Sequence, residues 1–167
     1  CRVTWLERAE KVIPGGVQTF SKARSQFPAN APTHIRRGRG AHVWSSDRRE
    51  FIDWMAGLGA ISLGYGDPDV DEAVKHQLCR GTIFGLSHPV EVEFAEEFCG
   101  ILPWGEDSAV KYGKNGSDAT AGAVRAARAI TGRDVIVSDG YHGWQDWTCP
   151  NPTGIPDVTR VLTRRLI

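Results

Sequence analysis

The stretch SAVKYGKNGSDATAGAVRAARAITGRDVIVS, residues 108–138, contains the pattern that decides the fold. Residues 108–112 are typical of a short apolar strand, and a tight glycine loop follows them. Residues 118–131 are rich in alanine and predict a helix that Gly132 ends. A second apolar strand is predicted over residues 134–138. Strand, helix and strand in this order form one βαβ unit, so we expect an α/β fold with a parallel or mixed sheet covered by helices.

Gly116 and Ser117 lie between the first predicted strand and the helix N-terminus. Unpaired backbone N–H groups and the positive end of the helix dipole meet at such a turn, and together they bind anions. Gly116 lets a ligand approach the backbone, and the Ser117 hydroxyl adds a donor. Ser117 or Asp118 can instead serve only to cap the helix. The motif alone leaves both interpretations open, because it is neither G-x-G-x-x-G nor a P-loop.

Residues 140–144, GYHGW, directly follow the second predicted strand. Loops at the carboxyl ends of parallel strands are where α/β proteins place ligands. Tyr141 can stack on a planar ligand ring there, or Tyr141 and Trp144 can pack down on the core. If the Gly116-Ser117 turn and residues 140–144 face one crevice, a phosphate-binding turn and an aromatic face would lie side by side. This arrangement suits a ligand with a phosphate and an aromatic ring.

Towards the N-terminus the pattern predicts three more helices and a hairpin. The helices are expected over residues 4–11, 67–79 and 89–101, with Thr4 and an aspartate at 67 or 69 as caps. Two β-rich segments flank residues 45–49 and predict the hairpin, although Arg48 and Arg49 are poor turn residues. A loop is expected from the Pro14-Gly15-Gly16 stop to about Gly40. Residues 56–66 are dense in glycine and are left unassigned.

The composition is that of an ordinary protein domain, with 41% apolar and 24% charged residues. Twenty basic residues balance twenty acidic ones, so no nucleic acid or anionic membrane partner is expected. No apolar run approaches the ~20 residues of a membrane span, and the N-terminus lacks a signal-peptide core. A cytoplasmic location is therefore expected. The four cysteines and five histidines are not at metal-ligand spacing, so we expect no metal site.

Several separated segments together resemble the class III aminotransferases, and above all the members that are similar to glutamate-1-semialdehyde aminomutase. The resemblance rests on Lys114-Asn115-Gly116-Ser117-Asp118-Ala119-Thr120, Thr131-Gly132-Arg133-Asp134 and Gly140-Tyr141-His142-Gly143. Earlier segments agree with it, namely Pro14-Gly15-Gly16-Val17, Gly40-Ala41-His42-Val43-Trp44, Phe51-Ile52-Asp53 and Leu63-Gly64-Tyr65-Gly66-Asp67-Pro68. The match covers nearly the whole chain in one order.

The resemblance implies the fold and its division into domains. It implies the N-terminal part of the large domain of a pyridoxal-phosphate (PLP) dependent transferase of fold type I, with a small N-terminal α+β subdomain. Residues 1–60, with the hairpin, would belong to the small subdomain. Residues 61–167 would be the first part of the large domain.

The resemblance also implies roles for individual residues. Gly116 and Ser117 would hold the phosphate of pyridoxal 5'-phosphate, Tyr141 would stack on its ring, and His142 would lie close by. The implied partners are a small-molecule amino donor and acceptor, and the full-length protein would be a homodimer. The implied activity is transamination or amino migration on a small amino acid, amino aldehyde or keto sugar, through a Schiff base.

Three positions on the substrate side depart from the family pattern. A Ser and an Arg that contact a substrate carboxylate in the aminomutase branch correspond to Thr19 and Lys22. Lysine cannot form the bidentate fork of arginine, so carboxylate recognition would change here. A Trp beside the substrate in many members corresponds to Gly59, which suggests a roomier or different pocket. In the hairpin the usual Asp-Gly turn is Asp47-Arg48, a departure that lowers stability.

The Schiff-base lysine of the family has no counterpart among the lysines of this chain, which are Lys11, Lys22, Lys75, Lys111 and Lys114. No catalytic residue is therefore expected here, and the isolated chain is expected to be inactive. The start at Cys1 and the end in VLTRRLI suggest an excerpt of a longer chain. The alternatives are a truncated, inactive homologue with a scaffold role or none, and an unrelated α/β phosphate-binding domain.

Overall fold

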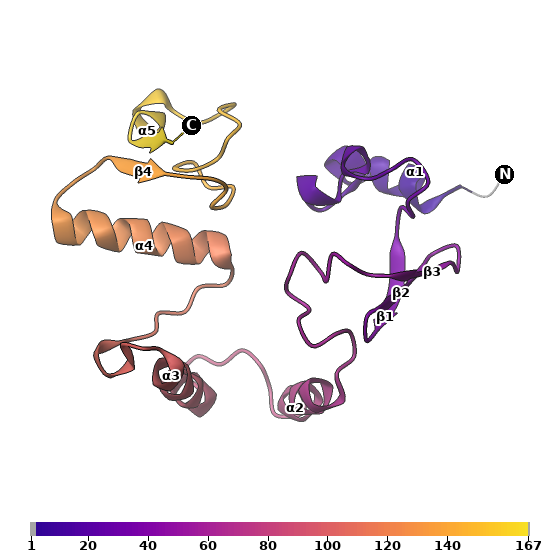
Figure 1. The fold of residues 1–167 in the computed structure, drawn as a ribbon, viewed down its shortest axis with the longest axis horizontal. Coiled ribbons are helices and arrows are strands. Elements are labelled where there is room, and N and C mark those ends of the chain that lie inside the picture. Colours follow the sequence, from indigo (N-terminus) through magenta and orange to yellow (C-terminus); the bar gives the residue numbers. More distant parts are fainter. Residues whose placement is uncertain (1–2, 167) are drawn as a thin grey trace. The chain divides into compact units, whose positions relative to one another are not determined.

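A computed structural model of the chain describes residues 3–166, so Cys1, Arg2 and Ile167 lie outside the described residues. The chain forms two compact units, Cys1–Gly85 and Leu86–Ile167. Figure 1 shows the elements of the first unit, which are α1 (Trp5–Glu10), β1 (Ile35–Arg39), β2 (His42–Ser45), β3 (Glu50–Ile52) and α2 (Pro68–Leu78). The second unit contains α3 (Pro89–Ile101), α4 (Gly116–Thr131), β4 (Ile136–Ser138), α5 (Asp157–Arg160) and β5 (Thr163–Arg165). Short 3-10 turns connect several of them.

All four predicted helices are confirmed as α1, α2, α3 and α4. Capping residues close to each end fix where several of them begin or stop. In α1, Thr4 and Glu7 form a reciprocal capping box: Thr4 Oγ1 accepts from the Glu7 N–H at 3.2 Å. Asp67 caps α2, its Oδ1 accepting from the N–H groups of residues 69 and 70 at 3.1 Å each. Gly132 ends α4 in the left-handed conformation, with φ of 65°.

A three-stranded antiparallel sheet, β1-β2-β3, organises the first unit. The predicted hairpin is confirmed as β2 and β3. The prediction of a loop up to Gly40 is wrong for residues 35–39, which form β1. The sequence IRRGR has one apolar residue and no alternation, so its strand character comes from pairing with β2 and not from its own pattern.

The glycine-dense segment 56–66 contains four consecutive residues with positive φ. Ala56, Gly57, Leu58 and Gly59 have consecutive φ angles of 44°, 60°, 63° and 85°. The Gly59 N–H donates to the Met55 carbonyl at 3.0 Å, which is the spacing of a helical hydrogen bond. Each L-residue held in this conformation costs about 1–2 kcal/mol, and such residues normally occur singly. We call residues 56–59 the left-handed turn.

Tyr65 fastens the segment that follows the left-handed turn to the sheet. Its backbone exchanges two hydrogen bonds with Gly40, of 2.7 and 2.9 Å, and its hydroxyl donates to Asp53 Oδ2 at 2.6 Å. The hydrogen bond to Asp53 and, less strongly, burial raise the pKa of Tyr65. Gly38 is required beneath the ring, since a Cβ there would collide with Tyr65.

In the second unit, β4 pairs with β5 as a parallel pair, with Ile136 opposite Thr163 and Ser138 opposite Arg165. The strand predicted over 134–138 is thus confirmed in its last three residues. The strand predicted over residues 108–112 is wrong: within residues 3–166 this segment pairs with no other strand. A strand needs a neighbour for its backbone hydrogen bonds, and an apolar pattern cannot supply one. The parallel pair is formed across α5 and not across α4.

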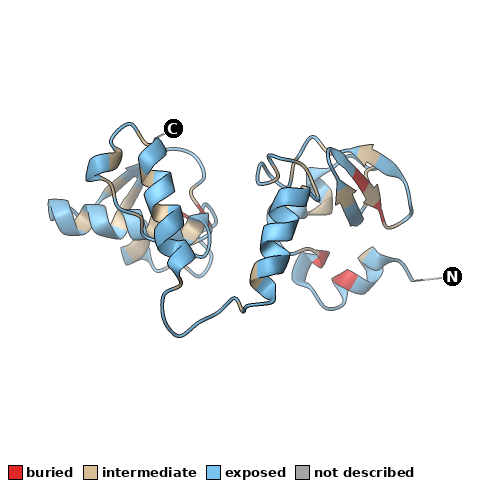
Figure 2. Ribbon diagram, turned by 90° about the horizontal axis from the view of Figure 1, so that it is seen from below, coloured by how far each residue is buried: buried red, intermediate tan, exposed pale blue. Residues whose placement is uncertain are grey.

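Few apolar side chains are buried, as the prevalence of exposed residues in Figure 2 shows. Among residues 3–166 the buried apolar ones are Ala9 and Val43, whereas Trp54 and Ile83 are 91% and 95% exposed. Large apolar surfaces of this kind are normally covered by other protein segments. The predicted domain division at residue 60 concerns a longer chain, and it stays a prediction.

Candidate functional site

The N-terminus of α4 presents unpaired backbone donors. Asn115 caps the helix, because its Oδ1 accepts from the Asp118 N–H at 2.9 Å. The interpretation of Ser117 or Asp118 as the cap is therefore wrong. Within residues 3–166 the N–H groups of Gly116 and Ser117 and the Ser117 hydroxyl have no hydrogen-bond acceptor. Together with the helix dipole, these groups form an anion-binding arrangement.

The segment after β4, residues 139–147, lies directly on this helix start; we call it the aromatic loop. Gly140 and Gly143 have φ angles of 73° and 122°, and they flank Tyr141 and His142. A Cβ at Gly143 would lie 2.6 Å from Ser117 Oγ, so only glycine allows this approach. The loop therefore brings its aromatic residues beside the unpaired donors.

Two side-chain contacts join the aromatic loop to the start of α4, and a third lies within the loop itself. The Thr120 hydroxyl lies 2.9 Å from the His142 carbonyl oxygen and 3.0 Å from that of Ser117. Gln145 Nε2 donates to Asp118 Oδ1 at 3.2 Å. The rings of His142 and Trp147 stack with centroids 6.3 Å apart and an interplanar angle of 14°. These contacts restrain the loop from His142 onward.

A cavity of about 350 Å³ lies where the two segments meet, lined by Asn115, Gly116, Ser117, Thr120, Tyr141, His142 and Gly143. The structure thus brings together all four residues predicted to bind a cofactor. Tyr141 and Trp144 are 74% and 71% exposed, so the interpretation that they pack down on the core is wrong. The aromatic face of Tyr141 is available to a ligand.

Asn115, Thr120 and Gly143 are functional candidates that the sequence analysis did not single out. Asn115 had a visible signal, because it is a preferred N-cap residue directly before a helix. Thr120 and Gly143 had none, since their partners lie 22 and 26 positions away in the chain and become neighbours only in the fold.

The residues predicted to contact a substrate belong to the first unit. Thr19 and Lys22 are exposed at the 3-10 turn Phe20–Lys22, where Lys22 Nζ donates to Gln18 Oε1 at 3.0 Å. Gly59 is the last residue of the left-handed turn, and a Cβ there would meet no atom within 4 Å. Their role in substrate binding stays a prediction.

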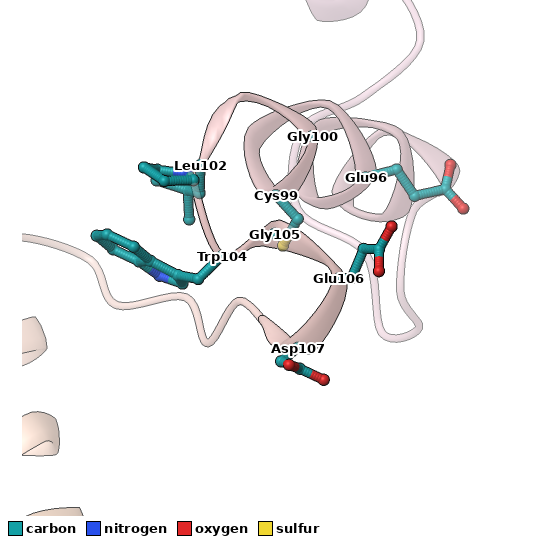
Figure 3. A pocket seen from close by; sticks show the side chains of 9 residues that line it. Glu96, Cys99, Gly100, Leu102, Trp104, Gly105, Glu106 and Asp107 are labelled. Carbon is teal, nitrogen blue, oxygen red and sulfur yellow. The ribbon is translucent and has the colours of Figure 1, made fainter.

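A larger hollow, of about 730 Å³, lies at the end of α3 in the second unit and is shown in Figure 3. Its lining includes Glu96, Glu106 and Asp107 but no lysine or arginine, with Cys99 and Trp104 beside them. Carboxylates repel a phosphate, so this hollow has the wrong charge for an anionic cofactor despite its size. Within the described residues, no group of three or more His, Cys, Asp or Glu is arranged to hold a metal ion.

No helix within residues 3–166 is both long enough and apolar enough to cross a membrane.

Comparison with protein families gives a match to the model of the class-III aminotransferases over residues 24–149. A 3-aminobutyryl-CoA aminotransferase of Cloacimonas acidaminovorans (strain Evry) is 34% identical, over 90% of this chain and 36% of its own. A glutamate-1-semialdehyde 2,1-aminomutase of Laribacter hongkongensis (strain HLHK9) is 39% identical, over 84% of this chain and 33% of its own. The chain thus spans about a third of the length of these curated relatives.

Comparison with solved structures agrees with this family assignment. The PLP internal aldimine form of the FumI protein from Sphingopyxis sp. MTA144 matches with a TM-score of 0.89 and 34% identity, over 96% of this chain and 39% of that one. An omega-transaminase from Sphaerobacter thermophilus matches with a TM-score of 0.85 and 29% identity, over 97% and 40%. The predicted fold class, that of a fold type I transferase covered in part, is confirmed, and an unrelated phosphate-binding domain is excluded.

Proposed function

The chain belongs to the class-III aminotransferase family, and we propose that it is the front part of a PLP-dependent aminotransferase or aminomutase. In this proposal Gly116 and Ser117 bind the phosphate of pyridoxal 5'-phosphate, and Tyr141 covers its ring with His142 beside it. The longer protein that contains these residues is called the parent below. The carrying observation is the set of unpaired donors at the start of α4, which line a cavity next to an exposed aromatic face.

The donor set fits a phosphate in both charge and geometry. Backbone N–H groups at a helix N-terminus stabilise negative charge, and hydrogen bonds to charged groups contribute about 1.5–3 kcal/mol each. Gly116 and Ser117 offer two such groups, and the Ser117 hydroxyl offers a third donor. No Asp or Glu lines this cavity. The phosphate would therefore gain hydrogen bonds here without facing a repelling carboxylate.

The aromatic loop fits the flat part of the same cofactor. An aromatic face beside a planar ring contributes about 0.5–1.5 kcal/mol beyond the burial of its area. Tyr141 would orient the ring and exclude water from one of its faces. When bound, PLP acts as an electron sink at the carbon that carries the amino group. The role of this chain is to hold and orient the cofactor.

The proposed substrates are a small amino acid, an amino aldehyde or a keto sugar, with amino transfer between molecules or amino migration within one. Thr19 and Lys22 would meet a substrate carboxylate or another anionic group. A lysine provides a point charge and not the bidentate fork of arginine, so recognition would depend less on the orientation of the anion. Gly59 would leave space for a bulky substrate.

The proposal assigns the Schiff-base lysine to a segment of the parent beyond these residues, and it assigns the parent a cytoplasmic, homodimeric state. The isolated chain is then inactive. A truncated homologue with a scaffold role or none is the competing proposal, which the partial coverage of the relatives leaves standing. A parent sequence that encodes the lysine would decide for the enzyme, and a stop after these residues would decide for the truncated form.

A pair of glycine substitutions tests the phosphate turn. A Cβ at Gly116 or at Gly100 would meet no atom within 4 Å, so at both positions the first carbon of a side chain has free space. Gly116 lines the candidate site and Gly100 lines the larger hollow. In the parent, Gly116→Leu should weaken PLP binding by about 100-fold, because two charged hydrogen bonds of about 1.5 kcal/mol are lost. Gly100→Leu should bind PLP as the parent does.

The measurement is a titration of the apo-parent with PLP, followed by the visible absorbance of the bound cofactor. Equal PLP affinities for the Gly116→Leu variant and the parent would exclude Gly116 and Ser117 as the phosphate turn. Circular dichroism of both variants in the far ultraviolet checks that the fold is retained.

A further inference from the structure

We propose that Thr120 is a positioning residue for the cofactor, because its side chain fastens the aromatic loop to the first turn of α4. This inference rests on the proposed function. Thr120 would not touch the ring itself. It would act through Tyr141, by holding the backbone next to Tyr141 at a fixed distance from the phosphate turn.

The position of the Thr120 hydroxyl supports this role. A threonine inside a helix usually donates to the carbonyl three or four residues earlier, and Thr120 reaches the Ser117 carbonyl in this way at 3.0 Å. It also lies 2.9 Å from the carbonyl oxygen of His142, on a segment 22 positions away. That carbonyl belongs to the peptide unit between His142 and Gly143. The hydroxyl has one proton, and by sharing it between these two carbonyl oxygens it joins the phosphate turn to the backbone just after Tyr141.

Thr120 is better placed for this role than the second tie between the same segments. The hydrogen bond from Gln145 to Asp118 is longer, at 3.2 Å, and exposed, and it joins two side chains that can rotate. The Thr120 bond is part-buried and ends on the backbone. A part-buried bond to the backbone restricts the loop more, because water competes less and fewer torsions remain free.

The left-handed glycine in the loop makes such a tie necessary. Gly143 has φ of 122°, a conformation that glycine reaches easily but does not hold by itself, since it has many alternatives. Gly140 at the other end of the aromatic pair has φ of 73°. A segment with a glycine at both ends is free to swing unless another contact restrains it. Thr120 supplies that contact at the end nearest to Ser117.

The test compares three substitutions in the parent. Thr120→Val keeps the shape and removes the hydroxyl, Thr120→Ser keeps the hydroxyl, and Thr131→Val is the matched control. Thr131 lies in the last turn of α4 and donates to the Ala127 carbonyl at 2.7 Å, and no contact to the aromatic loop is found for it within residues 3–166. The controls thus separate loss of the loop contact from loss of an in-helix hydroxyl.

Thr120→Val should weaken PLP binding by about fivefold, which is the effect of losing an aromatic contact. It should change the binding of inorganic phosphate to the apo-parent by less than twofold, since the proposed phosphate donors belong to Gly116 and Ser117 and not to the loop. The visible circular dichroism of bound PLP should also decrease, because the ring is held less uniformly. Thr120→Ser should restore the PLP affinity and the dichroism, and Thr131→Val should leave both unchanged.

A double-mutant cycle decides whether Thr120 acts through Tyr141. In a Tyr141→Ala background, Thr120→Val should have no further effect on PLP affinity. Equal losses of PLP and phosphate binding in Thr120→Val, or additive losses in the double variant, would overturn the inference. Such a result would leave the proposed function in place, because that function depends on the loss of PLP binding in Gly116→Leu. If Gly116→Leu has no effect, the proposed function itself fails.

Discussion

Left-handed backbone serves two different purposes in the two units of this molecule. In the aromatic loop, glycines at 140 and 143 adopt it, and one of them lies against Ser117. In the left-handed turn, Ala56 and Leu58 adopt it, with φ of 44° and 63°. At position 143 the loop requires glycine because Ser117 occupies the space that a Cβ would take. The turn tolerates side chains because only the backbone torsion is unfavourable.

Two physical reasons can disfavour a side chain at a residue with positive φ: a clash of its Cβ with a neighbour, and strain in the backbone torsion. The two regions separate these reasons. At Gly143 a side chain would meet a neighbour, so substitution changes the packing of the site as well as its torsion. At Ala56 and Leu58 the side chains are already present, and the surrounding hydrogen bonds hold the strained backbone. Substitutions at these positions should therefore differ in kind as well as in size.

Among the substitutions at residues with positive φ, the largest effect is expected for Gly143→Ala in the parent. The new Cβ would lie 2.6 Å from Ser117 Oγ, so the loop must move away from the phosphate turn. We expect PLP affinity to fall by more than about tenfold, with the loss of the Tyr141 contact and of at least one phosphate hydrogen bond. PLP retention during dialysis measures this. Gly140→Ala is the control, since its Cβ would meet no atom within 4 Å; equal losses in both variants would show that torsion alone matters.

Tyr141→Ala should have the next largest effect. Removal of the ring should weaken PLP binding by about 1 kcal/mol, or roughly fivefold, with the phosphate contacts intact. Conservative changes at the larger hollow, Trp104→Phe and Cys99→Ser, should leave PLP affinity unchanged. Titrations followed by visible absorbance distinguish these results. A loss in Trp104→Phe as large as that in Tyr141→Ala would move the ring site away from the aromatic loop.

Arg48→Gly should stabilise the parent by up to about 1 kcal/mol, because Arg48 has φ of 70° in the turn between β2 and β3. The neighbouring Arg49→Gly is the contrast, since Arg49 donates to Asp47 Oδ2 at 2.8 Å and should not gain stability when it is replaced. Urea denaturation gives the free energies of unfolding. If Arg48→Gly is neutral or destabilising, side-chain contacts of Arg48 offset the torsional strain, and the strain does not lower the stability of the turn.

The smallest effect concerns the hydrogen bond that fastens the segment after the left-handed turn to the sheet. The pKa of Tyr65 is raised by its hydrogen bond to Asp53, so the protonated hydroxyl is favoured in the folded state. Its contribution to stability is fully present below the ordinary tyrosine pKa of about 10 and is lost as the pH rises through the higher folded value. Tyr65→Phe should lack this alkaline loss.

Unfolding free energies of the parent and of Tyr65→Phe, measured from neutral to alkaline pH, provide the comparison. The difference between the two proteins should shrink as the pH rises. A difference that stays constant would mean that Tyr65 stabilises the segment through its ring and backbone alone.

Local signals in the sequence predicted most elements that the structure contains. The helix ends were predictable because Thr4, Asp67 and Gly132 act on groups within a few residues of themselves. Strands were predicted less well. Residues 35–39 pair in spite of their charge, and residues 108–112 stay unpaired in spite of their apolar pattern, because pairing depends on a distant segment.

The candidate site shows the same division. Gly116 and Ser117 were predicted from their place at a helix start, Tyr141 from its place after a strand, and His142 from the family resemblance, and the fold brings all four to one cavity. The residues that join the two segments, above all Thr120, could not be predicted, since their contacts span 22 or more positions. The left-handed turn was visible only as a run of glycines, and no pattern marked Ala56 and Leu58 as strained.

The left-handed turn also gives this protein an unusual tolerance for mirror-image chemistry. A D-amino acid prefers positive φ for the same steric reason that an L-amino acid avoids it. D-alanine at position 56 and D-leucine at position 58 would keep the two side-chain types while relieving the torsional strain that their L-forms carry. Ribosomal synthesis cannot make this exchange, whereas chemical ligation of a synthetic segment can. At these two positions the enantiomer is the better building block for the native backbone.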